Sequence, residues 1–300
     1  MPTSIETMIR KMHAYRDQLE EEVVGPARDE LMRIFAEAEV ALARQAKIFQ
    51  QLLTDPTGGL QPAVENITLA DRLLKNTEAE IKRLVIDPGQ VWADQAGALA
   101  HAAGRELTRI NFDVHQVSPE LLKSAFGNVT LTRGVLQVGF EDIYRIINTV
   151  GMDVGEWFRR ECMDAILEGL PVVSKTGGES LMTRLVESGR LKPITIRTES
   201  GKLIRRSISQ RAEAIARIEM GRIVNRTHEV LAEAILGKPA VYRNSNPRDS
   251  RTTDICRRAS AHKPMTLAQW SASEFGRPPR LRPFHLCRSV LIGGEEEWFQ

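Results

Sequence analysis

The sequence predicts a mainly α-helical protein that ends in a small, loop-rich α+β domain. Hydrophobic residues make up 42% and charged residues 27% of the 300 positions, which is typical of a globular chain. Aromatic residues make up only 5%, whereas the helix formers Ala, Leu, Glu and Arg are plentiful. Apolar residues recur at three- and four-residue spacing through most of the first 236 positions, and this periodicity is lost afterwards.

Residues 1–115 are predicted to form a helical assembly region. Three helices are expected, over residues 5–54, about 68–86 and about 90–111. Proline removes a backbone donor, so Gly25-Pro26 predicts a kink or short break, and Asp87-Pro88-Gly89 predicts the end of the second helix. Long helices with polar faces usually pack on each other or on a neighbouring subunit.

Residues 116–206 are predicted to be a helical region with an inserted β-hairpin. Ser118 is expected to cap a short helix that has Pro119 at its first position and ends near Phe126. A further helix with one apolar face is expected to follow it. The Thr- and Ile-rich sequence near residues 194–205 is typical of a β-hairpin.

Residues 207–300 are predicted to form the small C-terminal domain. A helix should begin at Ser207 and end at Leu236, with Gly237 at the C′ position. A short strand is expected over residues 240–243. Residues 201–300 hold 18 Lys and Arg against 10 Asp and Glu, so this basic end could face an acidic partner or simply be an ordinary solvated surface.

Several segments of the C-terminal third resemble the Mu F-like head-morphogenesis family of tailed phages. The segments are the helix SQRAEAIARIE at residues 209–219 with Asn225 beyond it, the strand VYR at 241–243, NSNPRDSRT at 244–252 followed by Cys256, and PPRLRPFHLCR at 278–288. Their order and spacing match the family pattern over about residues 160–292. In that pattern, a helix leads to a short strand, and a Pro-rich segment closes the motif.

The resemblance implies a minor capsid protein that is present in several copies in the phage head and is assembled in the host cytoplasm. Its expected partners are the portal protein and the major capsid or scaffolding protein. Its expected role is to assist head assembly and DNA packaging or delivery, without enzymatic activity or a cofactor. The sequence also lacks a secretory signal or an apolar stretch of about 20 residues, so no membrane segment is expected.

The residues that carry the motif are predicted to be structural. They are Glu219, Asn225, Asp249, Arg251, Cys256, His285, Cys287 and Arg288. Arginine offers a rigid two-pronged donor to a carboxylate, so Asp249, Arg251 and Arg288 are expected to form a buried ion-pair network that Glu219 could join.

Three alternative sites stay open at this stage. Arg280, Arg282 and Arg288 could contact phosphates in a DNA-binding protein of the head interior. A second set, Cys256, His262, His285 and Cys287, has the ligand types of a structural Zn²⁺ site, although no C-x₂-C or H-x₃-H spacing is present and a metal-free cluster is preferred. A metal-dependent nuclease is the least favoured alternative, because no ordered set of ligands with a general base is evident.

Overall fold

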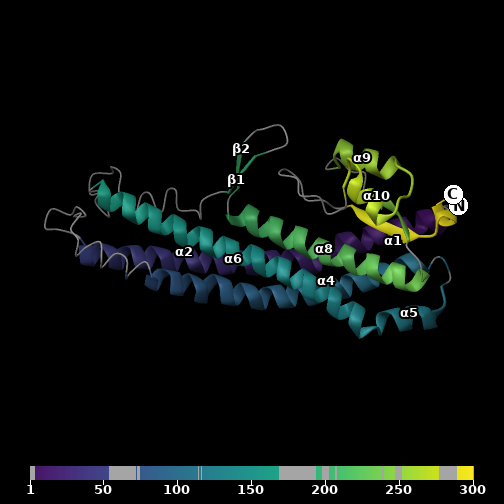
Figure 1. Ribbon diagram of the computed structural model, residues 1–300, viewed down its shortest axis with the longest axis horizontal. Helices are drawn as coiled ribbons and strands as arrows, with labels where there is room; N and C mark the ends of the chain where they lie inside the picture. The colour runs from purple at the N-terminus through teal and green to yellow at the C-terminus, as the bar shows by residue number, and fades with distance from the viewer. Residues whose placement is uncertain are drawn as a thin grey trace. The chain divides into compact units, whose positions relative to one another are not determined.

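The computed structural model describes most of the chain and is drawn in Figure 1. The described residues are 4–53, 72, 75–113, 115, 117–168, 194–197, 203–206, 208–237, 240–246, 252–276 and 289–299. They are mostly helical, which confirms the predicted fold class. None of the described helices is long and apolar enough to cross a bilayer.

The helices and strands follow one another along the chain in an order close to the predicted one. The helices are α1 (Ser4–Leu19), α2 (Gly25–Leu53), α4 (Asp87–Asp113), α5 (Pro119–Phe126), α6 (Val129–Leu167), α8 (Ile208–Leu236), α9 (Asp254–Ala261) and α10 (Leu267–Ala272). The strands β1 (Ile194–Arg197) and β2 (Leu203–Arg206) pair antiparallel, as do β3 (Val241–Ser245) and β4 (Val290–Gly294). The predicted hairpin is therefore confirmed as β1–β2.

Pro26 and Pro88 do not end helices. Each lies two residues after a five-residue π-helical turn, Glu20–Val24 and Lys82–Ile86. In both turns, the residue before the proline donates its N–H to the carbonyl of the first residue of the turn. The wider turn inserts one extra residue, so the helix continues past a residue that lacks a donor. The predicted end of a helix before Asp87 is therefore wrong, and the predicted interruption at Gly25-Pro26 is a π turn.

The predicted helix termini around α5 and α8 agree with the structure. The Ser118 hydroxyl accepts a hydrogen bond from the Leu121 N–H at 3.2 Å, which satisfies a donor in the first turn of α5. Gly237, directly after α8, has a φ of 63°. Glycine adopts this left-handed conformation without the steric penalty that other residues have, so it ends the helix efficiently.

The chain divides into two compact units, which are described separately below. Unit 1 contains Met1–Arg28, Ala93–Ile143 and Ala214–Gln300, and unit 2 contains Asp29–Trp92 and Tyr144–Glu213. Each unit thus gathers segments that are far apart in the sequence.

Within unit 2, Gly89 of α4 lies close to Ile147 of α6. A Cβ added at Gly89 would be 2.6 Å from the Ile147 Cγ2.

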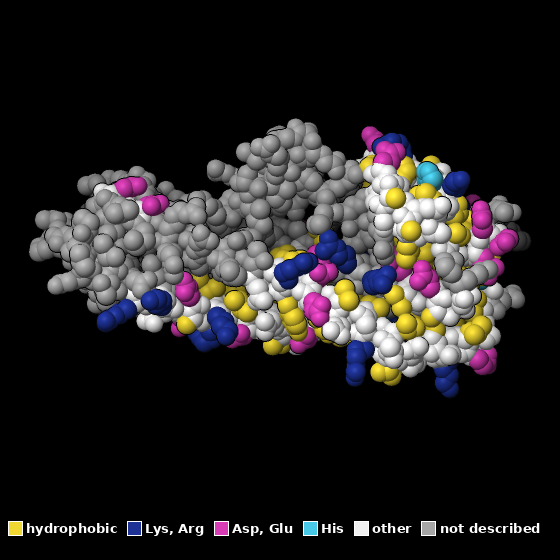
Figure 2. All heavy atoms as spheres, viewed as in Figure 1, with side chains coloured by type: hydrophobic (Ala, Val, Ile, Leu, Met, Phe, Trp, Pro, Cys, Tyr) yellow, Lys and Arg dark blue, Asp and Glu magenta, His cyan; other side chains and the backbone are white. Residues whose placement is uncertain are grey.

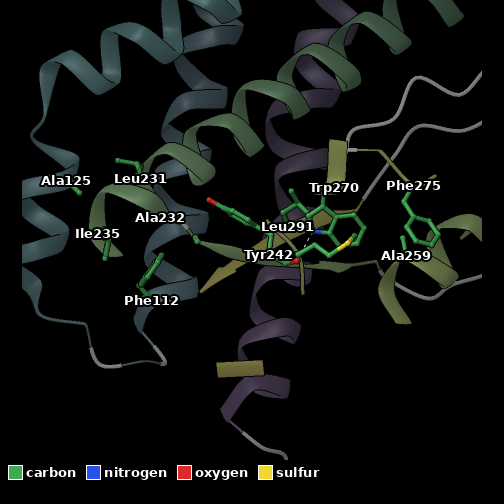
Figure 3. Packing of buried hydrophobic residues seen from close by; sticks show 12 residues of the cluster. Phe112, Ala125, Leu231, Ala232, Ile235, Tyr242, Ala259, Trp270, Phe275 and Leu291 are labelled. Atoms are coloured by element: carbon green, nitrogen blue, oxygen red, sulfur yellow. Dashed lines mark hydrogen bonds between the residues drawn. The ribbon is translucent and has the colours of Figure 1, made fainter. Parts of the chain in front are cut away.

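The β3–β4 ribbon and the short helices α9 and α10 belong to the core of unit 1. Tyr242 of β3 and Leu291 of β4 pack against Trp270 of α10, and side chains of α4 and α8 extend the same cluster (Figure 3). The Trp270 indole N–H donates to the Tyr242 carbonyl at 2.7 Å, and the Tyr242 hydroxyl donates to the Glu229 carbonyl at 3.1 Å. These two bonds attach the C-terminal elements to helix α8.

Helices α4 and α8 approach each other closely at Gly104 in unit 1. A Cβ at this position would lie 2.5 Å from the Thr227 Cβ and 2.7 Å from the Val224 carbonyl oxygen, which is backbone and cannot move alone. Gly134 of α6 is the matched contrast, because a Cβ there meets nothing within 4 Å.

We expect Gly104→Ala to lower the free energy of unfolding and Gly134→Ala to raise it. Overpacking usually costs about 1–3 kcal/mol, which exceeds the roughly 1 kcal/mol that alanine gains over glycine inside a helix. Gly134→Ala keeps only the gain, about 0.5–1 kcal/mol. Urea unfolding followed by circular dichroism measures both changes. Equal stabilisation by the two substitutions would contradict the close approach at Gly104.

Candidate functional site

A solvent-open groove of about 380 Å³ lies between α6 and α8 in unit 1. The residues that line it are Val135, Val138, Gly139, Asp142, Glu219, Arg222, Ile223, Asn225, Arg226 and Glu229. Four charged residues of α8 follow one another at spacings of three, four and three residues, which places them on one side of the helix. The groove therefore combines a stripe of charge from α8 with apolar side chains from both helices.

The charged side chains of the α6–α8 groove are unequally buried. Glu219 and Glu229 are almost fully buried, whereas Arg226 is 52% exposed at the side chain. Arg222 Nη1 donates to both carboxylate oxygens of Glu219, at 2.8 and 2.9 Å. Arg226 Nη1 lies 3.7 Å from the Glu229 Oε2, which is too long for a hydrogen bond. The Glu219 pair is thus the tighter of the two.

Helices α4 and α8 share a buried set of polar contacts. His101 Nδ1 lies 3.0 Å from the Thr227 hydroxyl, and His228 Nδ1 lies 3.0 Å from the Thr108 hydroxyl. The Thr108 hydroxyl donates to the Gly104 carbonyl, so it accepts from His228, and this network places the His228 proton on Nδ1.

The other ring nitrogen of His228 connects α8 to strand β4. His228 Nε2 accepts a hydrogen bond from the Gly293 N–H at 3.3 Å, and the Asn111 amide donates to the Gly293 carbonyl at 2.7 Å. Burial lowers the pKa of His228 to about 4, and a backbone contact with Leu291 opposes this shift only in part. At neutral pH, His228 is therefore an uncharged part of the packing between α4, α8 and β4.

The structure places four of the site residues predicted from the sequence, three from the motif and one, His262, from the possible Zn²⁺ set. Glu219 and Asn225 are buried in α8 and line the α6–α8 groove. Cys256 is buried in α9, and its carbonyl accepts from the Asn246 amide at 2.7 Å. His262 directly follows α9, and its ring lies edge-on to those of Trp270 and Phe275.

The remaining predicted site residues lie outside the described part of the chain. They are Asp249, Arg251, Arg280, Arg282, His285, Cys287 and Arg288. The ion-pair network expected for Asp249, Arg251 and Arg288 stays a prediction. The same holds for the Zn²⁺ site, because two of its four proposed ligands are in this group. Among the described residues, no three His, Cys, Asp or Glu side chains are placed to hold one metal ion.

Sequence reasoning missed a largely buried polar cluster at one end of the β3–β4 ribbon. His13 Nε2 of α1 lies 2.8 Å from the Ser245 hydroxyl. The Ser260 hydroxyl of α9 contacts the side-chain amides of Asn244, at 3.3 Å, and Asn246. The Asn-Ser-Asn sequence at the end of a predicted strand was the available signal, because such polar residues need partners once the strand is buried.

The described surface shows no large patch of a single charge on the face drawn in Figure 2. Basic and acidic side chains are interspersed there, and exposed salt bridges such as Arg33–Glu30 and Arg109–Glu106 pair them within single helices. Pairs of this kind contribute little to stability.

The sequence matches no protein-family model, and no curated protein or solved structure matches it.

Proposed function

We propose that this chain is a minor capsid protein of a tailed phage, which associates with the portal and assists head assembly and DNA packaging or delivery. Its partners would be the portal protein and the major capsid or scaffolding protein, and its location the phage head. The proposal assigns it an assembly role and no catalytic role. The resemblance of residues 160–292 to the Mu F-like family is the origin of this proposal.

The observation that carries the proposal is the pairing of Ser245 with Val290. The chain leaves the β3–β4 ribbon after Ser245 and re-enters it at Val290, at the same end. The motif segments 244–252 and 278–288 are thus connected to neighbouring strand ends. Helix α8 precedes β3, in the same order as the helix and strand of the family pattern. This arrangement suits a motif that stabilises a small domain.

Exposed apolar side chains on the helices of unit 1 also support an assembly role. Leu121, Val129 and Val138 are 51%, 70% and 56% exposed. Apolar residues scattered on a surface are common, but a protein built into a larger particle needs such surfaces for its partners to cover. One of them, Val138, lines the groove between α6 and α8.

Co-expression with the portal protein of the same phage genome tests the proposal. We expect the two proteins to co-purify through affinity and size-exclusion steps and to remain associated in 0.5 M salt. Failure to associate with portal, capsid and scaffolding proteins would contradict the proposal. Salt-sensitive binding to duplex DNA that is lost in the triple Ala variant of Arg280, Arg282 and Arg288 would instead favour the DNA-binding alternative.

A further inference from the structure

Unit 2 contains a solvent-open groove of about 460 Å³ between α2 and the helical residues 75–86. Val40 and Ala41 of α2 and Leu84 of the facing segment contribute apolar surface to its lining. Val40 is 54% exposed and Leu84 is partly buried. The groove therefore presents an apolar patch that another surface can cover.

The charges of α2 change sign along this groove. Arg33 donates to both carboxylate oxygens of Glu30 and also to Glu37, so two carboxylates share one guanidinium and this cluster is negative by one charge. Two helical turns beyond Glu37, Arg44 is exposed and pairs with no carboxylate of the described residues. No acidic residue follows Val40 in α2. The α2 side of the groove is thus negative at one end and positive at the other.

We propose that two copies of this chain associate by packing their α2 helices antiparallel along these grooves. Glu37 precedes Val40 by three residues, and Arg44 follows Ala41 by three. A two-fold axis that passes between Val40 and Ala41 therefore brings Glu37 of each copy opposite Arg44 of the other. Val40 of one copy would lie against Ala41 of the other, whose small side chain permits a close approach. The same patch then serves both copies, as a two-fold symmetric dimer requires.

Other occupants suit the groove less well. Parallel packing of two α2 helices would place Glu37 against Glu37 and Arg44 against Arg44, and like charges in contact are unfavourable. An acidic segment of another protein would neutralise Arg44 but would meet the negative end of the groove at Glu37, and a basic segment would do the reverse. On the other wall, Glu80 and Arg83 pair with each other at 2.8 Å, so they favour neither sign of charge.

The apolar patch and the ion pairs contribute differently to this dimer. Exposed ion pairs add little affinity, so the burial of Val40 and Leu84 supplies most of it, and the charges determine the orientation of the two helices. Because the patch is small, we expect a weak dimer with a Kd of about 0.1 mM. The inference is independent of the proposed function, which concerns association with other proteins.

Sedimentation equilibrium of the full chain at physiological salt tests the proposal. Glu37→Arg and Arg44→Glu should each weaken dimerisation at least about tenfold, because each reversal turns both symmetry-related ion pairs into repulsions. The double substitution of Glu37→Arg with Arg44→Glu should restore the Kd to within about threefold of the unmodified chain. An equimolar mixture of the two single variants should form a heterodimer equally well, since each then supplies the charge that the other needs.

Lys82→Glu is the matched control for these reversals. Lys82 is exposed in the facing segment but does not line the groove. Its substitution makes the same change of net charge as Arg44→Glu and should leave the Kd unchanged. Circular dichroism checks that each variant is folded. A chain that stays monomeric at about 1 mM would overturn the proposal. A dimer that neither single reversal weakens, or a double variant that dimerises no better than the single ones, would overturn it as well.

Discussion

Trp270→Ala is expected to lower the free energy of unfolding by about 3–5 kcal/mol, the range for deletion of a fully buried aromatic side chain. Trp270 is 0% exposed and packs with Tyr242, Leu291 and Phe275 in the core of unit 1. Its removal leaves a cavity and also deletes the indole hydrogen bond to the Tyr242 carbonyl. Chemical denaturation followed by circular dichroism measures the loss.

Trp270→Phe separates packing from hydrogen bonding. The phenyl ring fills most of the space, and the Tyr242 carbonyl still accepts from the Met265 N–H at 3.1 Å. The loss of stability should therefore be smaller than for alanine, about 1–3 kcal/mol.

Trp298 offers a matched control, because it is only partly buried and its ring stacks on that of His115, with 3.8 Å between the ring centroids. A greater loss in Trp298→Ala than in Trp270→Ala would show that the core is centred elsewhere.

The free energy of unfolding should fall as the pH is lowered from about 6.5 towards 4. The pKa of His228 is lowered from 6.5 to about 4 by burial, so the unfolded chain takes up a proton that the folded chain excludes. The stabilisation is complete above the unfolded pKa and is lost as the pH falls towards the folded one. A difference of this size corresponds to about 3 kcal/mol, since one pKa unit is about 1.4 kcal/mol. Urea unfolding at pH 7.5, 6, 5 and 4.5 measures it.

His228→Gln is the control for this pH dependence. Glutamine carries no titrating group, and its amide oxygen can still accept from the Gly293 N–H. We expect this variant to be less stable at pH 7.5 but to lose much less stability between pH 6.5 and 4.5. Some slope should remain, because burial also lowers the pKa of His101 and His115. Parallel pH profiles for the variant and the natural sequence would refute the role assigned to His228.

Local signals were sufficient for most of the long helices, for α5 and for the first hairpin. The cap at Ser118, the left-handed Gly237 and the β1–β2 hairpin each depend on residues within a few positions of one another. They can therefore be predicted from the local sequence. Proline was the exception. It removes a donor wherever it occurs, but a π turn before Pro26 and Pro88 accommodates that loss, and no local pattern distinguishes this outcome from a helix end.

The candidate site could be predicted only in part, because local sequence patterns do not show which distant segments meet. Glu219 and Asn225 were singled out through a resemblance, yet their neighbours Val138 and Asp142 lie about 80 residues earlier in the sequence and bear no motif. The Zn²⁺ ligands and the ion-pair network proposed for Asp249, Arg251 and Arg288 remain predictions.

Short helices such as α9 and α10 have too few residues to show periodicity, and the sequence analysis did not predict them.

By itself, the sequence determined that the protein is mainly helical, where its capped helices begin and end, and that the chain changes character after Leu236. The tertiary structure alone decided that β3 pairs with β4, that Gly104 sits against Thr227, and that His228 is buried between two helices and a strand. The physical reason is that helices and hairpins are stabilised by contacts between near neighbours. Close packing and the burial of polar groups depend instead on which distant segments meet, and the local pattern of residues carries little of that information.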